Sequence, residues 1–338
     1  MRRRTQSDTV ILAFVLYFLA IALAYNSLAQ IPLAKVTPAT LNRYRLQAAL
    51  DSGLCDLKPG ITQIDAPLYV RARTMLRGCG LASEIRLVGG GDWAVIVAPS
   101  SGSLYGAYID SVSIVGGGVL WTEFAQHCGM DRVWVSGAPG DGVRLAGDGE
   151  RLRLTDCVSW GNGGAGFRVS CATANNGIIF DHCNAQSNHA EGIVLETVAE
   201  NAELSETIIR DCTIQSNGGA QVRMTGYVVT TYIRDTWIEA IVPGVVGLLC
   251  EPRAPMVRRD PWRVSGLTID GATTISQIAT AARFIDCPSL TIDAMTVYPR
   301  ATATVEWQTF APGGRMLRLP ASQLRQVAPD EIGTAIKP

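Results

Sequence analysis

Three segments of the chain share one pattern of apolar and polar positions. They begin at residues 154, 180 and 209 and read LTDCVSWGNGGAGFRV, FDHCNAQSNHAEGIVL and IRDCTIQSNGGAQVRM. In each segment an apolar residue comes first, a cysteine fourth, an asparagine ninth and another apolar residue fourteenth. The three cysteines, Cys157, Cys183 and Cys212, are 26 and 29 residues apart. These segments are therefore predicted to be copies of one structural unit.

The same frame continues on both sides with less fidelity. Upstream copies include DSVSIVGGG and MDRVWVSGAPGDGVRL, and downstream copies include IRDTWIEA, LTIDGA and LTIDAM. Successive anchor positions are 21 to 31 residues apart, and they are Val112, Val133, Cys157, Cys183, Cys212, Thr236, Leu267 and Leu290. A period of this length, built from short segments with Gly and Asn turns, predicts a solenoid.

The residue types within each repeat favour strands over helices. β-Branched residues are frequent, no repeat has the i, i+3, i+4, i+7 apolar stripe of a helix, and the framework of leucine-rich repeats is absent. A parallel β-helix fits this pattern, because equivalent residues of successive coils then stack about 4.8 Å apart. The unequal gaps become loops of unequal length on a constant core.

With these features the chain resembles the pectin-lyase-like superfamily of right-handed parallel β-helices. Asn162, Asn188 and Asn217 resemble its asparagine ladder, and LQAALDSG followed by DLKPGITQIDAPLYVRARTMLRGCG resembles the start of many such domains. The resemblance covers roughly residues 46–298 and implies an all-β, single-stranded right-handed parallel β-helix of about 8–10 coils with an N-terminal capping helix. It is specific for the fold and weak for the activity.

The first 29 residues have the features of a secretory signal peptide. MRRR precedes the apolar run TVILAFVLYFLAIALA, and small residues follow at positions 27 and 29. The run has 16 residues, fewer than the roughly 20 that a transmembrane helix needs. An uncleaved membrane anchor is the alternative. Either interpretation places the remaining chain outside the cytoplasm, secreted, in the periplasm or in the cell envelope.

Four segments are predicted along the chain. Residues 1–29 form the signal peptide or anchor, 30–55 a linker and the N-terminal capping helix, 56–300 the β-helix, and 301–338 a C-terminal cap and tail. The capping helix is expected because Thr37 can cap a helix whose first residue is Pro38. Caps of this kind cover the core and the strand edges at the ends of a solenoid.

Charge and cysteine content narrow the function classes. The net charge of −1 gives no global attraction to nucleic acid or anionic membranes, so we expect no nucleic-acid partner and membrane contact only through the N-terminal segment. The nine cysteines include no C-x-x-C pair, which disfavours a zinc site of common spacing. Cys157, Cys183 and Cys212 are predicted to stack in the core as thiols.

The residues just before these cysteines allow two interpretations. FDHC resembles the WIDHC segment of pectate lyases, whose aspartate binds calcium, so Asp181 and His182 are candidate catalytic residues and Asp181 a candidate calcium ligand. The Trp of that segment is absent. The alternative is a solvated ridge at a turn, with charges pairing between coils. This ridge, which could also contact substrate, contains Arg210, Asp211, Arg234 and Asp235.

A second column of charged positions follows the last apolar position of the repeat by one residue. It contains Arg144, Arg168 and Arg223, with Val194 between the last two. Stacked guanidinium groups match the carboxylates of acidic sugars. In lyases of this architecture an arginine or lysine abstracts the proton next to the uronate carboxylate, which makes Arg144 and Arg168 catalytic candidates and Arg223 a substrate-binding candidate. The alternative is a scattered polar surface.

The sequence thus leaves two classes of function open. One is an exported enzyme on a polysaccharide, either a lyase that performs β-elimination on an acidic polysaccharide or, with less support, a glycoside hydrolase. The other is a non-catalytic β-helix that binds glycan or belongs to the cell surface. A glycan partner is expected in both. Exposed tryptophans among Trp121, Trp134, Trp160 and Trp237 could stack on sugar rings.

Overall fold

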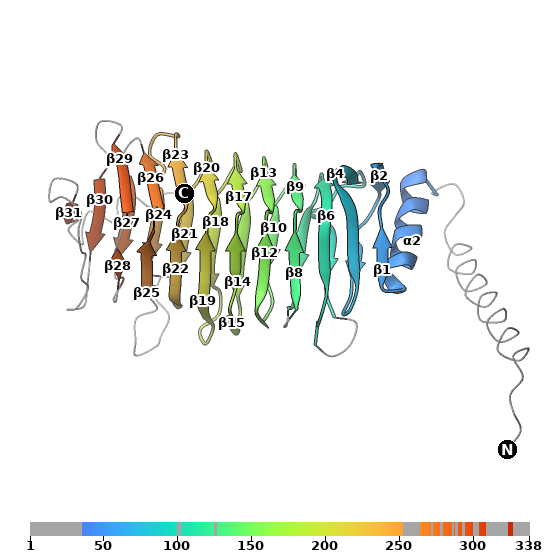
Figure 1. The fold of residues 1–338 in the computed structure, drawn as a ribbon, viewed down its shortest axis with the longest axis horizontal. Coiled ribbons are helices and arrows are strands. Elements are labelled where there is room, and N and C mark those ends of the chain that lie inside the picture. Colours follow the sequence, from blue (N-terminus) through green and yellow to red (C-terminus); the bar gives the residue numbers. More distant parts are fainter. Residues whose placement is uncertain are drawn as a thin grey trace, which may run out of the picture.

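Successive turns of the chain stack along one axis in the computed structural model of the protein (Figure 1). The structure describes residues 36–99, 103–124, 127–252, 264–271, 273–277, 280–285, 287, 290–292, 295–299, 304–308 and 324–326. Helix α2 (Pro38–Asp51) lies at one end of the stack, and the described strands pair in parallel in one sheet of 20 strands and another of 11. The predicted all-β solenoid of about 8–10 coils with an N-terminal helix is confirmed.

The bounds of the strands follow the predicted repeat. The larger sheet contains β1 (Leu54–Asp56), β2 (Gly60–Ile64), β4 (Met75–Leu87), β6 (Tyr108–Val115), β8 (Cys128–Asp131), β9 (Trp134–Ser136), β11 (Gly149–Glu150), β12 (Leu152–Thr155), β13 (Val158–Trp160), β15 (Ala174–Asn176), β16 (Ile179–Asp181), β17 (Asn184–Gln186), β19 (Glu203–Arg210), β20 (Thr213–Gln215), β22 (Val228–Arg234), β23 (Trp237–Ala240), β25 (Ser265–Asp270), β26 (Thr273–Gln277), β28 (Thr291–Ile292) and β29 (Met295–Pro299). The smaller sheet contains β3 (Leu68–Val70), β5 (Trp93–Val97), β7 (Gly118–Trp121), β10 (Val143–Leu145), β14 (Phe167–Cys171), β18 (Ile193–Thr197), β21 (Val222–Thr225), β24 (Leu248–Glu251), β27 (Thr280–Ile285), β30 (Thr304–Gln308) and β31 (Leu324–Gln326).

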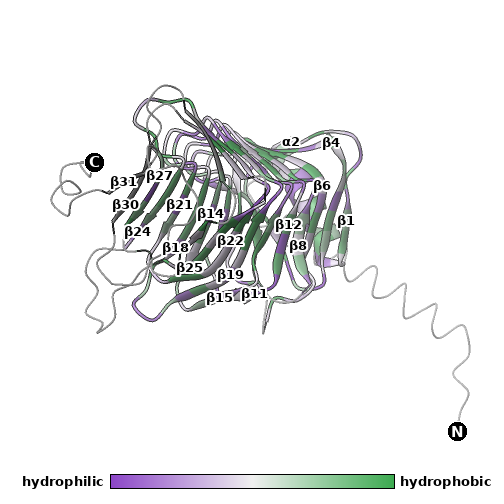
Figure 2. Ribbon diagram, turned by 60° about the vertical axis from the view of Figure 1, so that its left-hand side comes forward, coloured by the Kyte–Doolittle hydropathy of each residue, from purple (hydrophilic) through white to green (hydrophobic). Residues whose placement is uncertain are grey.

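The register between coils places equivalent apolar residues on top of one another. Leu154 of β12 pairs with Phe180 of β16, which pairs with Ile209 of β19. All three are fully buried, as is the matching column of the smaller sheet that begins with Phe167 and Ile193. Much of the strand surface is correspondingly hydrophobic in Figure 2. Burial of such side chains, each worth about 1.5–3 kcal/mol, is the main force that holds the coils together.

The predicted cysteine column lies inside this core. Cys157, Cys183 and Cys212 are buried and unbonded to other sulfurs, and the backbone N–H after one cysteine donates to the carbonyl of the cysteine one coil earlier. The Sγ of Cys183 also faces the Leu154 carbonyl at 3.4 Å. Burial and the neighbouring thiol of Cys183 raise the pKa of the Cys157 thiol, so the protonated thiol packs as a small apolar group.

The predicted asparagine ladder runs beside the cysteine column. The side-chain amide of Asn162 donates to Oδ1 of Asn188 at 2.9 Å, and the amide of Asn188 donates to Oδ1 of Asn217 at 2.9 Å. The amide of Asn217 then donates to Oε1 of Gln221 at 2.7 Å, which ends the ladder within the described residues. These side chains are buried, so the ladder satisfies polar groups that would otherwise lose water without a partner.

One position of each coil has a left-handed backbone, and this explains its residue types. Arg132, Asp156, His182, Asp211 and Asp235, each one residue before the core position of its coil, have φ between 48° and 53°. Asn, Asp and His are the side-chain residues that adopt this conformation most readily. The sharp bend it produces separates β12 from β13 and its equivalents, and it directs these side chains outward.

The ends of the solenoid differ in how far the structure describes them. Thr37 Oγ1 accepts the Thr40 N–H at 3.1 Å and caps α2, which buries Leu46 and Leu50 on the first coil. At the other end β30 pairs with β27 and β31 with β30, within the segment 301–338 for which a cap and tail are expected. The segment 1–29 lies outside the described residues, among which no helix is long and apolar enough to cross a bilayer.

Candidate functional site

Asp181 lies at the centre of a cluster of cationic side chains on the outer face of the larger sheet. Its carboxylate accepts hydrogen bonds from Arg210 Nε at 2.9 Å, Arg210 Nη2 at 2.8 Å, a guanidinium nitrogen of Arg153, and His182 Nδ1 at 3.0 Å. Only 3% of Asp181 is exposed. The Arg210 hydrogen bonds, followed by those from Arg153 and His182, hold the pKa of the Asp181 carboxyl well below its ordinary value.

This arrangement does not fit the calcium site predicted for Asp181. Calcium takes six to eight oxygen ligands, and both Asp181 oxygens already accept hydrogen bonds from cations. Asp181, His182 and Asp211 each offer one possible ligand atom, and these three atoms lie within 4.8 Å of one another. His182 and Asp211 are exposed. A metal ion would have to compete with two guanidinium groups for the Asp181 carboxylate. The contacts favour the alternative interpretation, a ridge of ion pairs between coils.

The rest of the ridge pairs differently from the expected scheme. Arg210 bonds to Asp181 of the preceding coil, while Arg234 lies 3.3 Å from Asp235 and 3.8 Å from Asp270. Both Arg234 and Asp235 are well exposed, with side-chain exposures of 61% and 39%. Pairs this exposed contribute about 0–1 kcal/mol each. The predicted substrate-binding ridge is therefore mostly a set of solvated charges around one buried carboxylate.

The predicted arginine column is in register, but two of its members are already neutralised. Arg168 pairs with Asp141 at 2.9 Å, Glu196 at 3.3 Å and Glu191 at 3.6 Å. Arg223 pairs with Glu251 at 2.7 Å and with Glu191 at 3.1 Å. Sugar carboxylates would have to displace these protein carboxylates, so the column is a poor cradle for them.

Arg144 differs from the other two arginines of the column. It pairs in the strand register with Arg168. Its Nε is buried without a hydrogen-bond partner, and the described residues form no ion pair with it. The column thus brings Arg144 and Arg168 together as the sequence predicted. It does not bring either next to Asp181 and His182, which lie on β16 and its turn in the other sheet.

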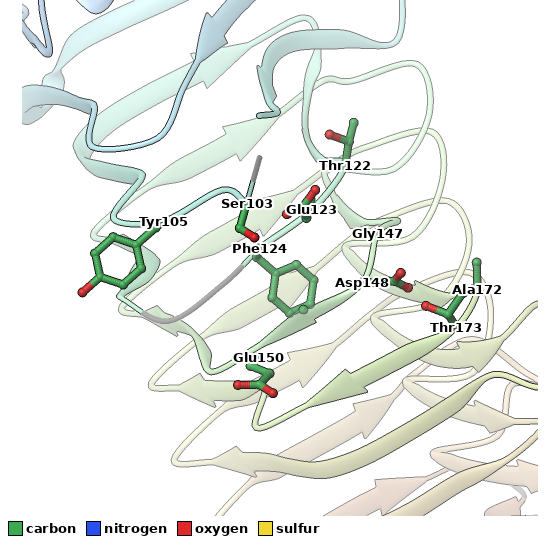
Figure 3. Close-up of a pocket in the computed structure, with 11 residues that line it drawn as sticks. Ser103, Tyr105, Thr122, Glu123, Phe124, Gly147, Asp148, Glu150, Ala172 and Thr173 are labelled. Atoms are coloured by element: carbon green, nitrogen blue, oxygen red, sulfur yellow. The ribbon is translucent and has the colours of Figure 1, made fainter. Parts of the chain in front are cut away.

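An acidic cleft of about 760 Å³ opens where strands of the smaller sheet turn toward the next strand of the larger sheet (Figure 3). Its carboxylates are Glu123, Asp148 and Glu150. Glu123 is half-buried, whereas Asp148 and Glu150 are exposed. The other lining residues are Ser103, Tyr105, Thr122, Phe124, Gly147, Gly149, Ala172 and Thr173, none of which is basic.

Glu123 and Asp148 belong to adjacent coils. The Phe124 N–H donates to the Asp148 carbonyl at 3.1 Å, and Phe124 forms a parallel bridge with Gly149. Coils at this spacing separate the two backbones by about 4.8 Å. The Leu104 N–H donates to Glu123 Oε1 at 3.1 Å and fixes the direction of that carboxylate.

Two glycines allow the coils to approach this closely at the cleft. A Cβ on Gly147 would lie 1.7 Å from the Thr122 carbonyl oxygen, and one on Gly149 would lie 2.2 Å from the Phe124 ring. The sequence AGDGE therefore contains Gly on both sides of Asp148 for a steric reason. The glycines on both sides of Asp148 are the sequence signal for the cleft, but Glu123, Asp148 and Glu150 were not among the predicted site residues.

Aromatic residues form part of the cleft wall. Tyr105 is 45% exposed at the rim, whereas Phe124 is 1% exposed and its ring packs in the core. The ring of His127 meets Tyr105 edge-on with centroids 5.3 Å apart. His127, isolated in the sequence, is thus next to the cleft. The exposed Tyr105 ring offers packing to a ligand, and the acidic groups offer proton transfer.

The chain is similar to known β-helix proteins in sequence pattern and structure. Residues 96–238 match the family described as Right handed beta helix region. Pectate lyase Pel9A matches at 14% identity with a TM-score of 0.52, over 79% of this chain and 75% of that one. The tailspike gp49 of Pseudomonas phage LKA1 matches at 15% identity with a TM-score of 0.54, over 78% and 62%. No curated protein matches the sequence.

Another structural match is tailspike protein 2 of Escherichia coli O157:H7 bacteriophage CAB120, at 10% identity and a TM-score of 0.55. The match includes 84% of this chain and 44% of that tailspike. This chain therefore spans less than two thirds of the length of either tailspike. Identities this low show the fold alone. The chain has the right-handed parallel β-helix of the pectin-lyase-like fold, as the sequence predicted.

Proposed function

We propose that this protein is a carbohydrate-active β-helix protein that binds a glycan in the acidic cleft and hydrolyses it. The observation that carries the proposal is the pair Glu123 and Asp148, held on adjacent coils in a cleft that Tyr105 also lines. The pectate lyase Pel9A has the same fold, which is compatible with a polysaccharide ligand. The signal peptide predicted at residues 1–29 is compatible with a substrate outside the cytoplasm.

The geometry of the pair suits glycoside hydrolysis. Retaining glycosidases hold two carboxyl groups about 5–5.5 Å apart, and a backbone spacing of about 4.8 Å allows side chains on adjacent coils to reach that separation. One carboxylic acid protonates the glycosidic oxygen as the C–O bond breaks, and the other carboxylate attacks the anomeric carbon. Water then displaces the sugar from that carboxylate, and its proton returns to the first group. Leu104 N–H holds Glu123 in position for one of these roles.

The charge of the cleft argues against the lyase on an acidic polysaccharide that the sequence suggested. Three carboxylates line the cleft and no lining residue is basic, so a uronate carboxylate would meet like charge. The arginines predicted to hold such a substrate are engaged by Asp141, Glu191 and other protein carboxylates. A neutral or amino sugar avoids this repulsion, and an amino sugar would gain attraction.

The test is incubation of the full chain with neutral, amino-sugar and uronate polysaccharides, each with and without calcium. We expect new reducing ends on a neutral or amino-sugar polymer and no unsaturated products. Glu123→Gln and Asp148→Asn should each lower kcat/KM about 10²- to 10⁴-fold, as expected for loss of a general acid, base or nucleophile. The matched control is Glu200→Gln, an exposed carboxylate outside the cleft, which should retain full activity.

Several results would overturn the proposal. Absorbance from unsaturated ends on a uronate polymer would favour the lyase. Reducing ends on no substrate would favour a binding protein without catalysis. If both cleft variants were as active as the wild type, the reaction would take place at another part of the chain.

A further inference from the structure

A flat strip of aromatic and amide side chains covers the outer face of four neighbouring strands, away from the acidic cleft. The strands are β13, β17, β20 and β23, which lie side by side in Figure 1. Two outward-facing columns run across them. One contains Val158, Asn184, Thr213 and Trp237, and the other Trp160, Gln186, Gln215 and Glu239.

The two tryptophans mark opposite corners of this strip. Trp160 is 46% exposed and Trp237 is 39% exposed, although large aromatic side chains usually bury most of their surface. The Trp237 indole N–H donates to Glu239 Oε2 at 3.3 Å, which restrains the ring. By contrast, Trp121 is fully buried in the core and Trp134 is half-buried. Of these four tryptophans, Trp160 and Trp237 are the most exposed.

The positions between the tryptophans are polar but almost uncharged. Gln186 and Gln215 are half-buried, and within the described part of the chain their side-chain amides make no hydrogen bond. Each amide offers two donors and one acceptor. Glu239 is the one charged residue among the eight positions. The strip thus carries far fewer charges than the ridge of Asp and Arg residues on the other side of the left-handed turn.

From this arrangement we infer that the strip is a docking surface for an extended, uncharged glycan that lies along the solenoid axis. Sugar rings stack on tryptophan faces, and sugar hydroxyl groups pair with side-chain amides. Trp160 and Trp237 are three coils apart, about 14 Å along the axis, so one chain of several sugars can contact both. The low charge of the strip fits a neutral polymer and gives no counterpart for carboxylated sugars.

This inference shares with the proposed function only the assumption that the ligand is a carbohydrate, because the strip and the cleft are separate. Binding is therefore measured on Asp148→Asn, which the proposed function makes inactive, so that hydrolysis does not consume the ligand. Affinity gel electrophoresis with hydroxyethylcellulose, mixed-linkage β-glucan, galactomannan and dextran supplies neutral probes. Polygalacturonate supplies the anionic probe.

We expect at least one neutral polymer to retard the protein. Trp160→Ala and Trp237→Ala should each weaken that retardation about five- to tenfold, and the double variant should abolish it. The matched control, Tyr69→Ala, removes an exposed aromatic residue of β3 in the other sheet, and its retardation should equal that of the parent. Unchanged circular dichroism of all variants shows that folding is intact.

The outcomes separate the two proposals. Retardation that depends on the two tryptophans supports the strip even if no hydrolysis is ever found. Retardation by no neutral polymer, by polygalacturonate alone, or equally in the double variant overturns it. A dimer in light scattering that becomes a monomer in the double variant also overturns it, since the strip would then be an interface between two copies of this chain.

Discussion

Replacement of Asn188 by alanine is expected to destabilise the protein by about 3–6 kcal/mol. Asn188 Oδ1 accepts the backbone N–H of Asn162 at 3.1 Å and its amide at 2.9 Å. Its own amide donates to the Ser159 carbonyl at 3.1 Å and to Asn217 Oδ1 at 2.9 Å. Each buried group left without a partner costs about 1–3 kcal/mol. Domain stabilities are about 5–15 kcal/mol, so the loss would be a large share of the total.

Urea unfolding followed by circular dichroism measures this loss. Asn184→Ala is the matched control, because Asn184 precedes Asn188 by four residues but faces outward and is half-buried. A surface change of this kind is expected to stay within about 0.5 kcal/mol. If the two variants unfolded at the same urea concentration, the ladder would contribute nothing specific to stability.

Replacement of Asp181 by asparagine is expected to cost about 2–3 kcal/mol at neutral pH. It leaves Arg153 and Arg210 without the carboxylate that they share. Loss of one partner from a fully buried pair costs about 3–5 kcal/mol. The smaller value applies here because the two arginine side chains are 51% and 41% exposed and can turn toward water.

The cost of Asp181→Asn should also depend on pH in a defined direction. The Arg210 and Arg153 contacts lower the pKa of Asp181 in the folded state, while an unfolded aspartate has a pKa of about 3.9. The carboxylate therefore adds stability that is complete above pH 5 and is lost as the pH falls below about 4. The difference in unfolding free energy between wild type and variant should accordingly shrink from pH 7 to pH 3.

Urea unfolding at pH 7, 4 and 3 tests this dependence. The control is Asp56→Asn, which breaks the Arg77–Asp56 pair whose two side chains are each 47% exposed. That change should leave the stability nearly unchanged at pH 7, because solvent screens so exposed a pair. A difference for Asp181→Asn that stays constant or grows toward acid pH would contradict the assigned direction of the pKa shift.

The stacked core was predictable from sequence because it repeats the same chemistry in every coil. Cys157, Cys183 and Cys212 occupy one buried column, and the asparagines five residues later occupy another. Each position has the same neighbours one coil away, so an alignment of the repeats is also a contact map. The outward direction of Arg144, Arg168 and Arg223 followed from the same alternation.

The partners of outward side chains could not be predicted in this way. Arg168 meets Asp141 and Glu191, which share one position of the repeat, but the same position holds Ala165 and Ala220 in neighbouring coils, so the repeat does not predict an acidic partner there. Asp181 is buried by Arg153 and Arg210 from the coils on either side, so a residue that looked like a metal ligand is an ion-pair acceptor.

The acidic cleft was missed because it lies outside the repeated positions. Glu123 follows β7 and Asp148 follows β10, at points where the coils have no common sequence pattern. Their proximity depends on Gly147 and Gly149, which let one coil pass close to the other. A Gly on both sides of an acidic residue is a weak signal in a chain with 34 glycines.

Both proposed sites and the buried columns require that coils stack in register, and one distance tests that requirement directly. Spin labels are attached at Arg77→Cys and Arg234→Cys in a Cys79→Ser background, because the other cysteines are buried. The two positions are six coil steps apart in one outward column. Double electron–electron resonance should give a narrow distribution centred about 29 Å, widened by the label arms. A broad distribution, or a narrow one centred far from this value, would contradict the stacked solenoid on which both proposed sites depend.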